Sequence, residues 1–346
     1  MSGGVDSSVA AGLLRDQGHE VVGATLKLWG GTSDSGCCSV GDVEDARRVA
    51  QILGLDHHVF NFTEEFERDV VDPFVAGHAA GLTPNPCIAC NRHLKFDLLF
   101  ARAKRLGFDF VATGHHAQVV TRRGRPVLAR GADPAKDQSY VLGFLDQDTL
   151  SRLILPIGAM TKSEVRSAAE CFGLRVWNKP DSQDVCFIES TKGREAFLAD
   201  RLRLTTATIF DAASGETLGT TPAAELVTVG QRRGVAPGRD GERRFVTKVD
   251  LVARRVDVDR LENVLRHDLH LVTDSVHFAG EPLSAPTVVL AQWSAHGKPV
   301  RALLDVSAHH VTLELPARPV APGQTIVFYD LEDSEVVLGA AYVART

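Results

Sequence analysis

The sequence predicts an α/β protein with a doubly wound parallel sheet, followed by a small β-rich linking domain and a C-terminal antiparallel β-barrel. Helical and strand patterns alternate over residues 1–195, which is typical of a parallel sheet with helices on both faces. From about Thr205 onward, short alternating stretches separated by turn signals replace that pattern. The 346 residues also exceed the usual size of one domain. We place the domains at 1–195, 196–265 and 266–346.

The composition is that of an ordinary globular protein, with 44% hydrophobic and 24% charged residues. No apolar run approaches the ~18 residues that cross a bilayer, and residues 1–6 lack the basic and apolar regions of a signal peptide. We therefore expect a cytoplasmic protein without a membrane partner. The net charge of −6 excludes a general coating for nucleic acid, although clustered Lys and Arg residues can still bind RNA locally.

The elements of the first part follow from apolar spacing and from the residues that end helices. We expect helices at 7–17, 43–53, 88–106 and 161–172, and strands at 20–28, 57–62 and 108–113. Gly54, Gly107 and Gly173 end three of the helices, and the capping box Thr161–Glu164 begins the last one. Because Cys171 lies within an apolar helical pattern, we expect it to be an inert, buried residue.

The second part is predicted to be antiparallel β structure. Apolar and polar residues alternate over 247–258 and 300–315. Turn signals such as Pro237-Gly238, Asp240-Gly241 and Pro322-Gly323 separate these stretches.

The segment Ser2-Gly3-Gly4-Val5-Asp6-Ser7-Ser8 has the features of an anion-binding loop. Two glycines permit tight backbone conformations, hydroxyl groups follow them, and a helix then begins. Together these groups suit a pyrophosphate, although neither the Walker sequence nor the GxGxxG fingerprint is present. Asp6 would repel a phosphate, so its role is to hold Mg²⁺ or to orient the loop. Such a loop normally follows a buried strand, and we favour a late start of the chain as the reason that none precedes Met1.

Six cysteines stand at positions 37, 38, 87, 90, 171 and 186. Cys87 and Cys90 follow the prolines of Thr83-Pro84-Asn85-Pro86 and lie one helical turn apart, on the same face. Such a pair fits a redox couple, half of a zinc site, or two packed thiols. Cys186 follows the polar segment 178–185, and the residues alone leave its reactivity open.

Taken together, these segments identify a family. The loop SGGVDSS resembles the SGGxDS loop of PP-loop ATP pyrophosphatases, which have a Rossmann-like fold. The segments SGGVDSS, TPNPCIACN, ATGHH, KDQSY and DSQDVCFI occur in this order. Their order and spacing resemble the tRNA-specific 2-thiouridylases (the MnmA family), and the resemblance extends to the late segment 321–324.

The resemblance implies a reaction: the 2-oxygen of the wobble uridine in tRNA is replaced by sulfur while ATP is consumed. The C2 oxygen would be adenylated, with Mg²⁺ assisting, and a cysteine persulfide would supply the sulfur. Cys90 matches the family nucleophile and Cys186 the persulfide carrier. The implied partners are tRNA and a persulfide sulfur-donor protein.

The resemblance also assigns binding residues. The nucleotide would contact Ser2, Gly3, Gly4, Val5, Asp6, Ser7, Leu26 and Gly114. The tRNA would contact Asn85, Pro86, Cys87, His115, Lys136, Asp137, Gln138 and Gln324. His116 is expected to be structural. Basic clusters that could assist RNA binding include Arg102, Lys104 and Arg105; Arg122, Arg123 and Arg125; Arg232 and Arg233; and Arg243, Arg244 and Lys248.

The sequence departs from the family at Cys87, where many members have an acid that serves as a general base. The thiols of Cys87, Cys90 and Cys186 therefore also fit an alternative in which they ligate an iron–sulfur cluster. Cys37 and Cys38 are expected to be peripheral. The alternative function is that of another PP-loop ATP pyrophosphatase, a ligase that forms an amide or guanidino bond on a small molecule.

Overall fold

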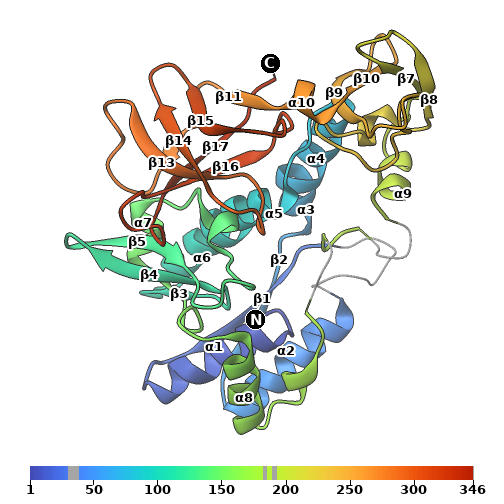
Figure 1. Ribbon diagram of the computed structural model, residues 1–346. Helices are drawn as coiled ribbons and strands as arrows, with labels where there is room; N and C mark the ends of the chain where they lie inside the picture. The colour runs from blue at the N-terminus through green and yellow to red at the C-terminus, as the bar shows by residue number, and fades with distance from the viewer. Residues whose placement is uncertain (30–38, 182–184, 189–192, 346) are drawn as a thin grey trace.

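The structure is a computed structural model that describes residues 1–29, 39–181, 185–188 and 193–345. Figure 1 shows the α/β part with the N-terminus below, a barrel-like sheet at the upper left and a smaller sheet at the upper right. No helix in these residues is both long and apolar enough to cross a membrane.

The first part of the chain carries most of the helices. Its elements are α1 (Val5–Asp16), β1 (Val22–Lys27), α2 (Val40–Leu53), β2 (Asp56–Asn61), α3 (Thr63–Phe66), η1 (Glu67–Val71), α4 (Asp72–Ala79), α5 (Pro86–Ala89), η2 (Cys90–Leu98), α6 (Leu99–Arg105), β3 (Val111–Ala112), β4 (Ala117–Arg122), β5 (Arg125–Arg130), η3 (Ser139–Leu142), α7 (Gln147–Ser151), β6 (Leu153–Ile154), α8 (Lys162–Cys171), η4 (Arg175–Asn178) and α9 (Gly193–Ala199).

The second part is built almost entirely of strands. Its elements are β7 (Ala207–Asp211), β8 (Thr217–Thr221), η5 (Ala224–Leu226), β9 (Phe245–Asp250), β10 (Arg255–Asp259), α10 (Leu261–Val264), β11 (Arg266–His270), β12 (His277–Phe278), β13 (Thr287–Gln292), β14 (Val300–Asp305), β15 (His310–Ala317), β16 (Thr325–Tyr329) and β17 (Val337–Tyr342).

The parallel sheet of the α/β part consists of two separate pairs. β1 pairs with β2 and β3 pairs with β6, both in parallel. Met1 lies beside β1, where its carbonyl oxygen accepts a hydrogen bond from Thr25 Oγ1 at 2.7 Å. Gly114, just after β3, lies against the first turn of α1, because a Cβ there would stand 2.5 Å from the backbone of Asp6 and Ser7. The predicted loop therefore lies between the two strand pairs.

The helix predictions are confirmed where local signals were strong. α2 begins at a capping box on Ser39 and ends at Gly54, whose φ of 68° is left-handed. α8 begins at the predicted capping box on Thr161. The helix predicted at 88–106 is a continuous helical run whose middle, η2, is a π-helix. The helical residues 63–79 were not predicted, because Pro73 and the scattered apolar residues of that stretch obscure the period.

Cys171 corrects one prediction, because its side chain is exposed. The buried residues of α8 are Val165 and Ala169, four positions apart on one face of the helix. Cys171 follows Ala169 by two positions and therefore lies on the opposite side.

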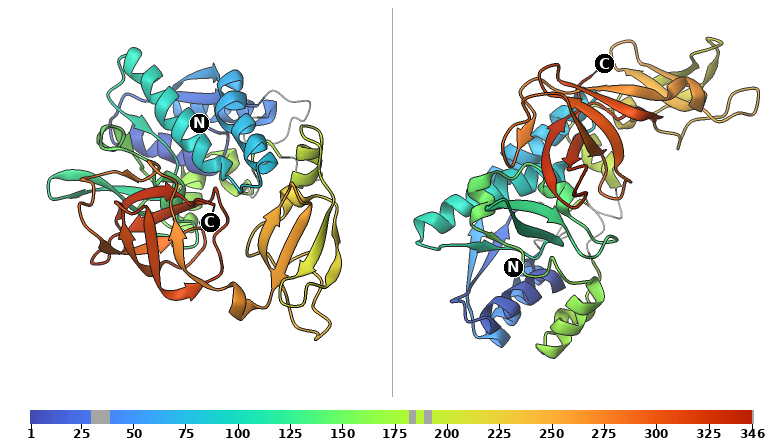
Figure 2. Two further views of the ribbon diagram at one scale, coloured as in Figure 1. Left: turned by 90° about the horizontal axis from the view of Figure 1, so that it is seen from above. Right: turned by 60° about the vertical axis from the view of Figure 1, so that its left-hand side comes forward.

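The second part forms two sheets. The smaller has the strand order β8-β7-β10-β9, and its β7–β10 pair is parallel, so the antiparallel prediction was wrong for that pair. The larger has the order β11-β15-β14-β13-β16-β17-β12, and its strand pairs are antiparallel, as predicted. A bridge joins Leu271, just after the edge strand β11, to Val343, just after β17, which is next to the other edge; the sheet therefore curls into a barrel (Figure 2).

The barrel packs directly on the α/β part. One cluster of buried apolar residues contains side chains from both; its members include Ile88, Tyr140, Leu142, Val327, Tyr329 and Ala340. The hairpin β4–β5 also joins the barrel, since Arg130 N donates to Glu335 O at 2.8 Å. The smaller sheet has a core cluster of its own.

Candidate active site

The loop before α1 ends at a helix N-terminus. α1 begins at Val5 with Gly4 as its N-cap, a residue that has no side chain with which to cap the first turn. Gly3 has a left-handed φ of 69°, and a Cβ there would overlap the backbone oxygen of Asp42. Ser7 Oγ accepts from Ser2 N at 3.0 Å and so closes the loop. A helix N-terminus with bare N–H groups and hydroxyls is suited to an anionic ligand.

Asp6 anchors two side chains beside this loop. Its Oδ1 accepts from Lys162 Nζ at 2.6 Å and lies 3.3 Å from His116 Nε2. Burial alone would raise the pKa of Asp6, but the hydrogen bonds from His116 and Lys162 outweigh burial and lower it. The carboxylate therefore stays ionised and holds an ammonium group at the edge of the loop.

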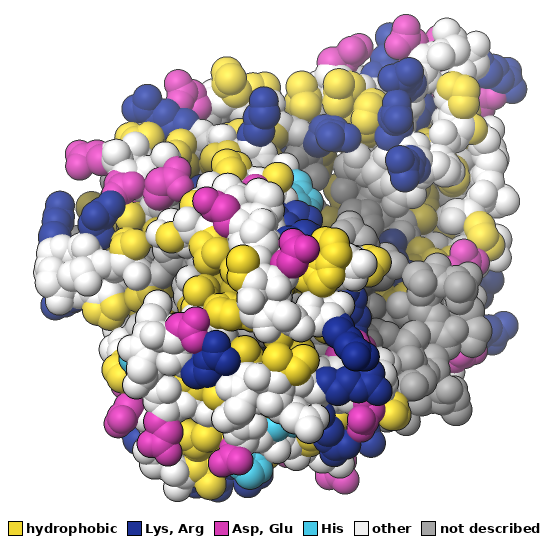
Figure 3. All heavy atoms as spheres, turned by 90° about the horizontal axis from the view of Figure 1, so that it is seen from below, with side chains coloured by type: hydrophobic (Ala, Val, Ile, Leu, Met, Phe, Trp, Pro, Cys, Tyr) yellow, Lys and Arg dark blue, Asp and Glu magenta, His cyan; other side chains and the backbone are white. Residues whose placement is uncertain are grey.

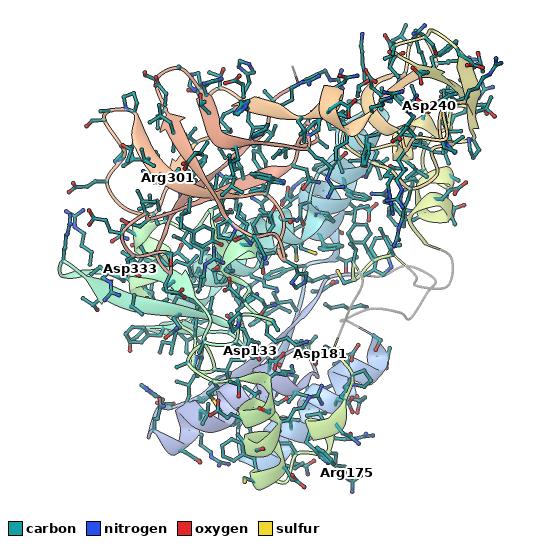
Figure 4. The ribbon with its side chains drawn as sticks, in the orientation of Figure 1. Asp133, Arg175, Asp181, Asp240, Arg301 and Asp333 are labelled. Carbon is teal, nitrogen blue, oxygen red and sulfur yellow. The ribbon has the colours of Figure 1, made fainter. Side chains whose placement is uncertain are left out.

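A second carboxylate, Asp181, shares Lys162 with Asp6. Lys162 Nζ lies 3.0 Å from Asp181 Oδ1, which is also 3.0 Å from an amino nitrogen of Arg166. Lys136 Nζ donates to the other carboxylate oxygen at 2.8 Å. Burial opposes ionisation, yet the lysine hydrogen bonds lower the pKa of Asp181 to about 2. Figure 4 labels Asp181 close to Asp133, which accepts from the backbone N–H of Lys162 at 3.0 Å.

Lys179 fixes the loop from its other side. Its Nζ donates to Gly3 O at 3.0 Å and to carboxylate oxygens of Asp42 and Asp45, each at 2.7 Å. The loop backbone, α2 and the chain that leads to Asp181 are thereby joined through one ammonium group.

The segment that carries the first cysteine pair begins with a helix cap. Asn85 Oδ1 accepts from Cys87 N at 3.0 Å, so Asn85 caps α5 as its N-terminal residue. Pro86 is buried at the first helical position, where proline lacks no needed donor. Cys87 is exposed, whereas Cys90 is 8% exposed. The two thiols of the pair therefore face different environments.

Cys186 joins the same apolar cluster as Cys90. Cys90 belongs to a buried cluster rich in phenylalanine, and Cys186 packs against that cluster. Phe187, which follows Cys186, lies within 5.6 Å of both Phe66 and Phe74 between ring centroids. Leu26 of β1, a predicted nucleotide contact, packs against this cluster as well. Sequence segments that lie far apart in the chain therefore meet here.

Several predicted tRNA contacts are engaged within the protein. The Asp137 carboxylate lies 2.9 Å from Arg130 Nη1 and accepts from Ser139 Oγ. Gln138 Oε1 accepts from His116 N at 2.9 Å. His115 is buried beside Thr113, and burial, followed by the charge of Lys95, lowers its pKa well below the ordinary value. These tRNA contacts stay predictions.

The possible metal ligands differ in how well they fit. Mg²⁺ usually takes one or two protein carboxylates and completes its shell with water and substrate phosphates, which Asp6 beside the loop permits. Cys87, Cys90 and Cys186 do not form a ligand set for an iron–sulfur cluster. The described residues contain no group of three or more His, Cys, Asp or Glu side chains arranged for a metal ion. The described residues therefore do not fit an iron–sulfur cluster. Cys37 and Cys38 lie outside the described residues.

Three residues of this site were not predicted from the sequence. The sequence indicates only a capping box at Lys162, only a polar segment before Cys186 at Lys179, and only a structural role for His116. Each of these side chains bonds to residues that are far away in the sequence. A single sequence does not show which distant residues come together. Figure 3 shows Lys and Arg side chains gathered on the face that carries α1 and α8, beside the grey residues.

The comparisons with known proteins cover the whole chain. Residues 1–190 match the family model described as "tRNA methyl transferase HUP domain", and residues 268–343 match "Aminomethyltransferase beta-barrel domain". The tRNA-specific 2-thiouridylase MnmA of Mycobacteroides abscessus is 43% identical over 100% of this chain and 98% of its own. That of Acidothermus cellulolyticus is 43% identical over 100% of this chain and 96% of its own. This chain therefore belongs to the family of tRNA-specific 2-thiouridylases.

Proposed function

We infer that this protein replaces the 2-oxygen of a uridine in tRNA by sulfur in a reaction that consumes ATP. Relatives more than 40% identical over the full chain carry that activity in their names. The loop before α1, which ends at the glycine N-cap of a helix, supports the use of ATP. We propose the wobble uridine of tRNA as the target, a persulfide-carrying protein as the sulfur donor and the cytoplasm as the location of the protein.

The first half-reaction makes a leaving group. The C2 oxygen of uracil attacks the α-phosphorus of ATP, and the bond from that phosphorus to the bridging oxygen breaks to release pyrophosphate. The loop N–H groups and Lys162 stabilise the negative charge that develops on the pyrophosphate. Mg²⁺, held by Asp6, would neutralise phosphate charge when bound. Leu26 and Gly114 would border the nucleotide.

The second half-reaction moves sulfur. The terminal sulfur of a Cys186 persulfide attacks C2, and AMP leaves with the original oxygen. The Cys90 thiolate then attacks the Sγ atom of Cys186, which breaks the sulfur–sulfur bond, leaves sulfur on the base and forms a Cys90–Cys186 disulfide. A thiol reductant restores both thiols, and the donor protein reloads Cys186.

The placement of Cys90 and Cys186 supports sulfur transfer independently of the family. Cys90 and Cys186 are 96 positions apart in the sequence, yet both belong to or pack against the same phenylalanine-rich cluster. A sulfur-transfer mechanism requires that these two side chains approach one another. A ligase that forms an amide or guanidino bond has no use for that convergence, and the full-length relatives do not favour it.

The test is thiolation of tRNA transcripts by the purified full chain with ATP, Mg²⁺, a persulfide donor and a reductant. We expect Cys90→Ser and Cys186→Ser to abolish 2-thiouridine, measured by mass spectrometry of digested tRNA. Cys171→Ser is the matched control, because Cys171 is exposed on α8, and it is expected to retain activity. Full activity of Cys186→Ser would contradict the persulfide route.

The role of Cys87 needs a separate variant. The resemblance to the family implies an acid at this position in many members, and a carboxylate can accept the proton that a Cys87 thiolate would otherwise have to take. We expect Cys87→Asp to support thiolation and to broaden its activity toward lower pH. Iron and acid-labile sulfide are measured on the same anaerobic preparations; cluster-free protein that thiolates tRNA supports the persulfide route.

A further inference from the structure

The barrel holds the segment that leads to the first cysteine pair. Thr83 N donates to Pro322 O at 2.8 Å, and Gln324 Nε2 donates to Thr83 O at 2.8 Å. Both backbone groups of Thr83 are therefore taken by one turn of the barrel. Gly323 makes this contact possible, since its φ is +84° and a Cβ there would stand 3.0 Å from the Cβ atom of Leu82.

That turn is itself fixed to the barrel. Gly323 N donates to Val343 O, and Val343 N donates to Gln324 O, each at 2.8 Å. Val343 directly follows Tyr342, the last residue of β17. Thr83 is thus held in place by a turn that is hydrogen-bonded to the end of a barrel strand.

A second connection joins α5 to the barrel. The Tyr140 hydroxyl donates to Thr325 O at 3.0 Å, and the Tyr140 ring lies in the same buried cluster as Ile88 of α5. Asn85 caps this helix through Cys87 N. Tyr140 is 1% exposed, so burial raises its pKa and keeps the hydroxyl protonated as a donor.

A third connection is apolar. Ile88 lies between the two cysteines and is 1% exposed. It belongs to the same buried cluster as Val327 and Tyr329 of β16 and Ala340 of β17. The helix that carries Cys87 and Cys90 is therefore packed against the barrel as well as tied to it.

We propose that the C-terminal barrel positions the Cys90 thiol, with Gln324 and Tyr140 as positioning residues. The barrel is then part of the catalytic framework in addition to any contact with RNA. This inference rests on the proposed function only in naming Cys90 as a reacting group, because the connections themselves involve no substrate.

The experiment measures alkylation of Cys90 by iodoacetamide in the full chain without tRNA, quantified by peptide mass spectrometry. Exposed Cys171 on α8 serves as the internal reference. We expect Gln324→Met and Tyr140→Phe each to raise the Cys90-to-Cys171 ratio of rates about fivefold, the scale of one lost hydrogen bond. Tyr140→Phe removes a single oxygen and keeps the buried ring, so we expect this variant to fold.

The matched control is Gln147→Met. Gln147 Nε2 donates to Pro126 O at 2.7 Å, a bond of the same type that joins α7 to β5 and includes neither residues 83–90 nor the barrel turn. We expect its ratio to stay at the wild-type value. An unchanged ratio in folded Gln324→Met and Tyr140→Phe, or an equal rise in Gln147→Met, would overturn the proposal.

Thiolation measured at saturating tRNA separates positioning from RNA binding. If Gln324 only contacts tRNA, excess tRNA restores the wild-type rate; if it positions Cys90, the single-turnover rate stays low. A wild-type protein that does not thiolate tRNA would defeat the proposed function, whereas the alkylation ratios would still decide the present inference.

Discussion

His115 makes the stability of the protein depend on pH. Burial and the nearby charge of Lys95 hold its pKa well below the ordinary value, so the folded protein keeps the ring neutral. Below about pH 6.5 this histidine binds a proton in the unfolded chain but not in the folded protein. The free energy of unfolding therefore falls, by at most about 1.4 kcal/mol per pH unit for this group. We expect His115→Gln to flatten the fall in the free energy of unfolding between about pH 7 and 5.

The measurement is urea unfolding of both proteins across that pH range. The pKa values of His57, His78 and His277 are also lowered, chiefly by burial, so the wild-type slope contains their contributions. The difference between the two proteins isolates His115. Parallel curves would show that the ring is protonated alike in both states.

Lys162 is expected to act on ATP rather than on tRNA. Its ammonium group lies between Asp6 and Asp181 at the loop, where a triphosphate would bring further negative charge. Lys162→Met should raise the KM for ATP roughly tenfold, the scale of one charge-assisted hydrogen bond, and leave the KM for tRNA unchanged. Lys298→Met, which alters an exposed lysine of the barrel, is the control for a general effect of charge.

At the scale of single residues, the sequence predicts chemical type better than environment. The order of the glycines, hydroxyls and cysteines is local and was sufficient to identify the family. The burial of Asp137 and the exposure of Cys171 depend on partners such as Arg130 or on the face that a helix presents. No single-sequence pattern contains that information.

Among the elements, the loop after β3 is in close contact with the first turn of α1, beside the nucleotide loop. A methyl group at Gly114 would stand 2.5 Å from the carbonyl carbon of Asp6 and the nitrogen of Ser7, so the loop must move. We expect Gly114→Ala to weaken ATP binding by at least about tenfold in calorimetric titration, because shifted N–H groups no longer converge on the phosphates.

Gly280→Ala is the control for this variant, since no atom of the described residues lies within 4 Å of the place that a Cβ would take at that glycine. Its affinity for ATP should equal that of the wild type. An affinity of Gly114→Ala equal to that of Gly280→Ala would mean that the nucleotide is not bound at this end of α1.

The elements that the sequence predicted well are those with terminal signals. α2 and α8 carry capping boxes, and their starts were predicted to within three residues. The π-helix η2 and the parallel pairing of β7 with β10 have no such local signal. Both depend on how distant segments pack, which periodicity alone does not report.

For the whole molecule, binding of tRNA must overcome a net charge of −6. Only some of the basic residues are available: Arg244, which we included among the basic clusters, is buried in ion pairs with Asp211 and Asp240. Local contacts of the remaining Lys and Arg residues with phosphates release counterions. We expect the affinity for tRNA to fall at least about tenfold between about 50 and about 200 mM salt, measured by filter binding. A flat response would contradict phosphate contact.

The apolar cluster shared by the α/β part and the barrel has a consequence for how the protein can be divided. Removing residues 266–346 would separate Val327, Tyr329 and Ala340 from Ile88 and Leu142. The remaining fragment would then expose an apolar patch to solvent. Such a fragment would aggregate or melt early, whereas the smaller sheet, with its self-contained core, is the piece that tolerates excision. The α/β part and the barrel therefore depend on one another for stability.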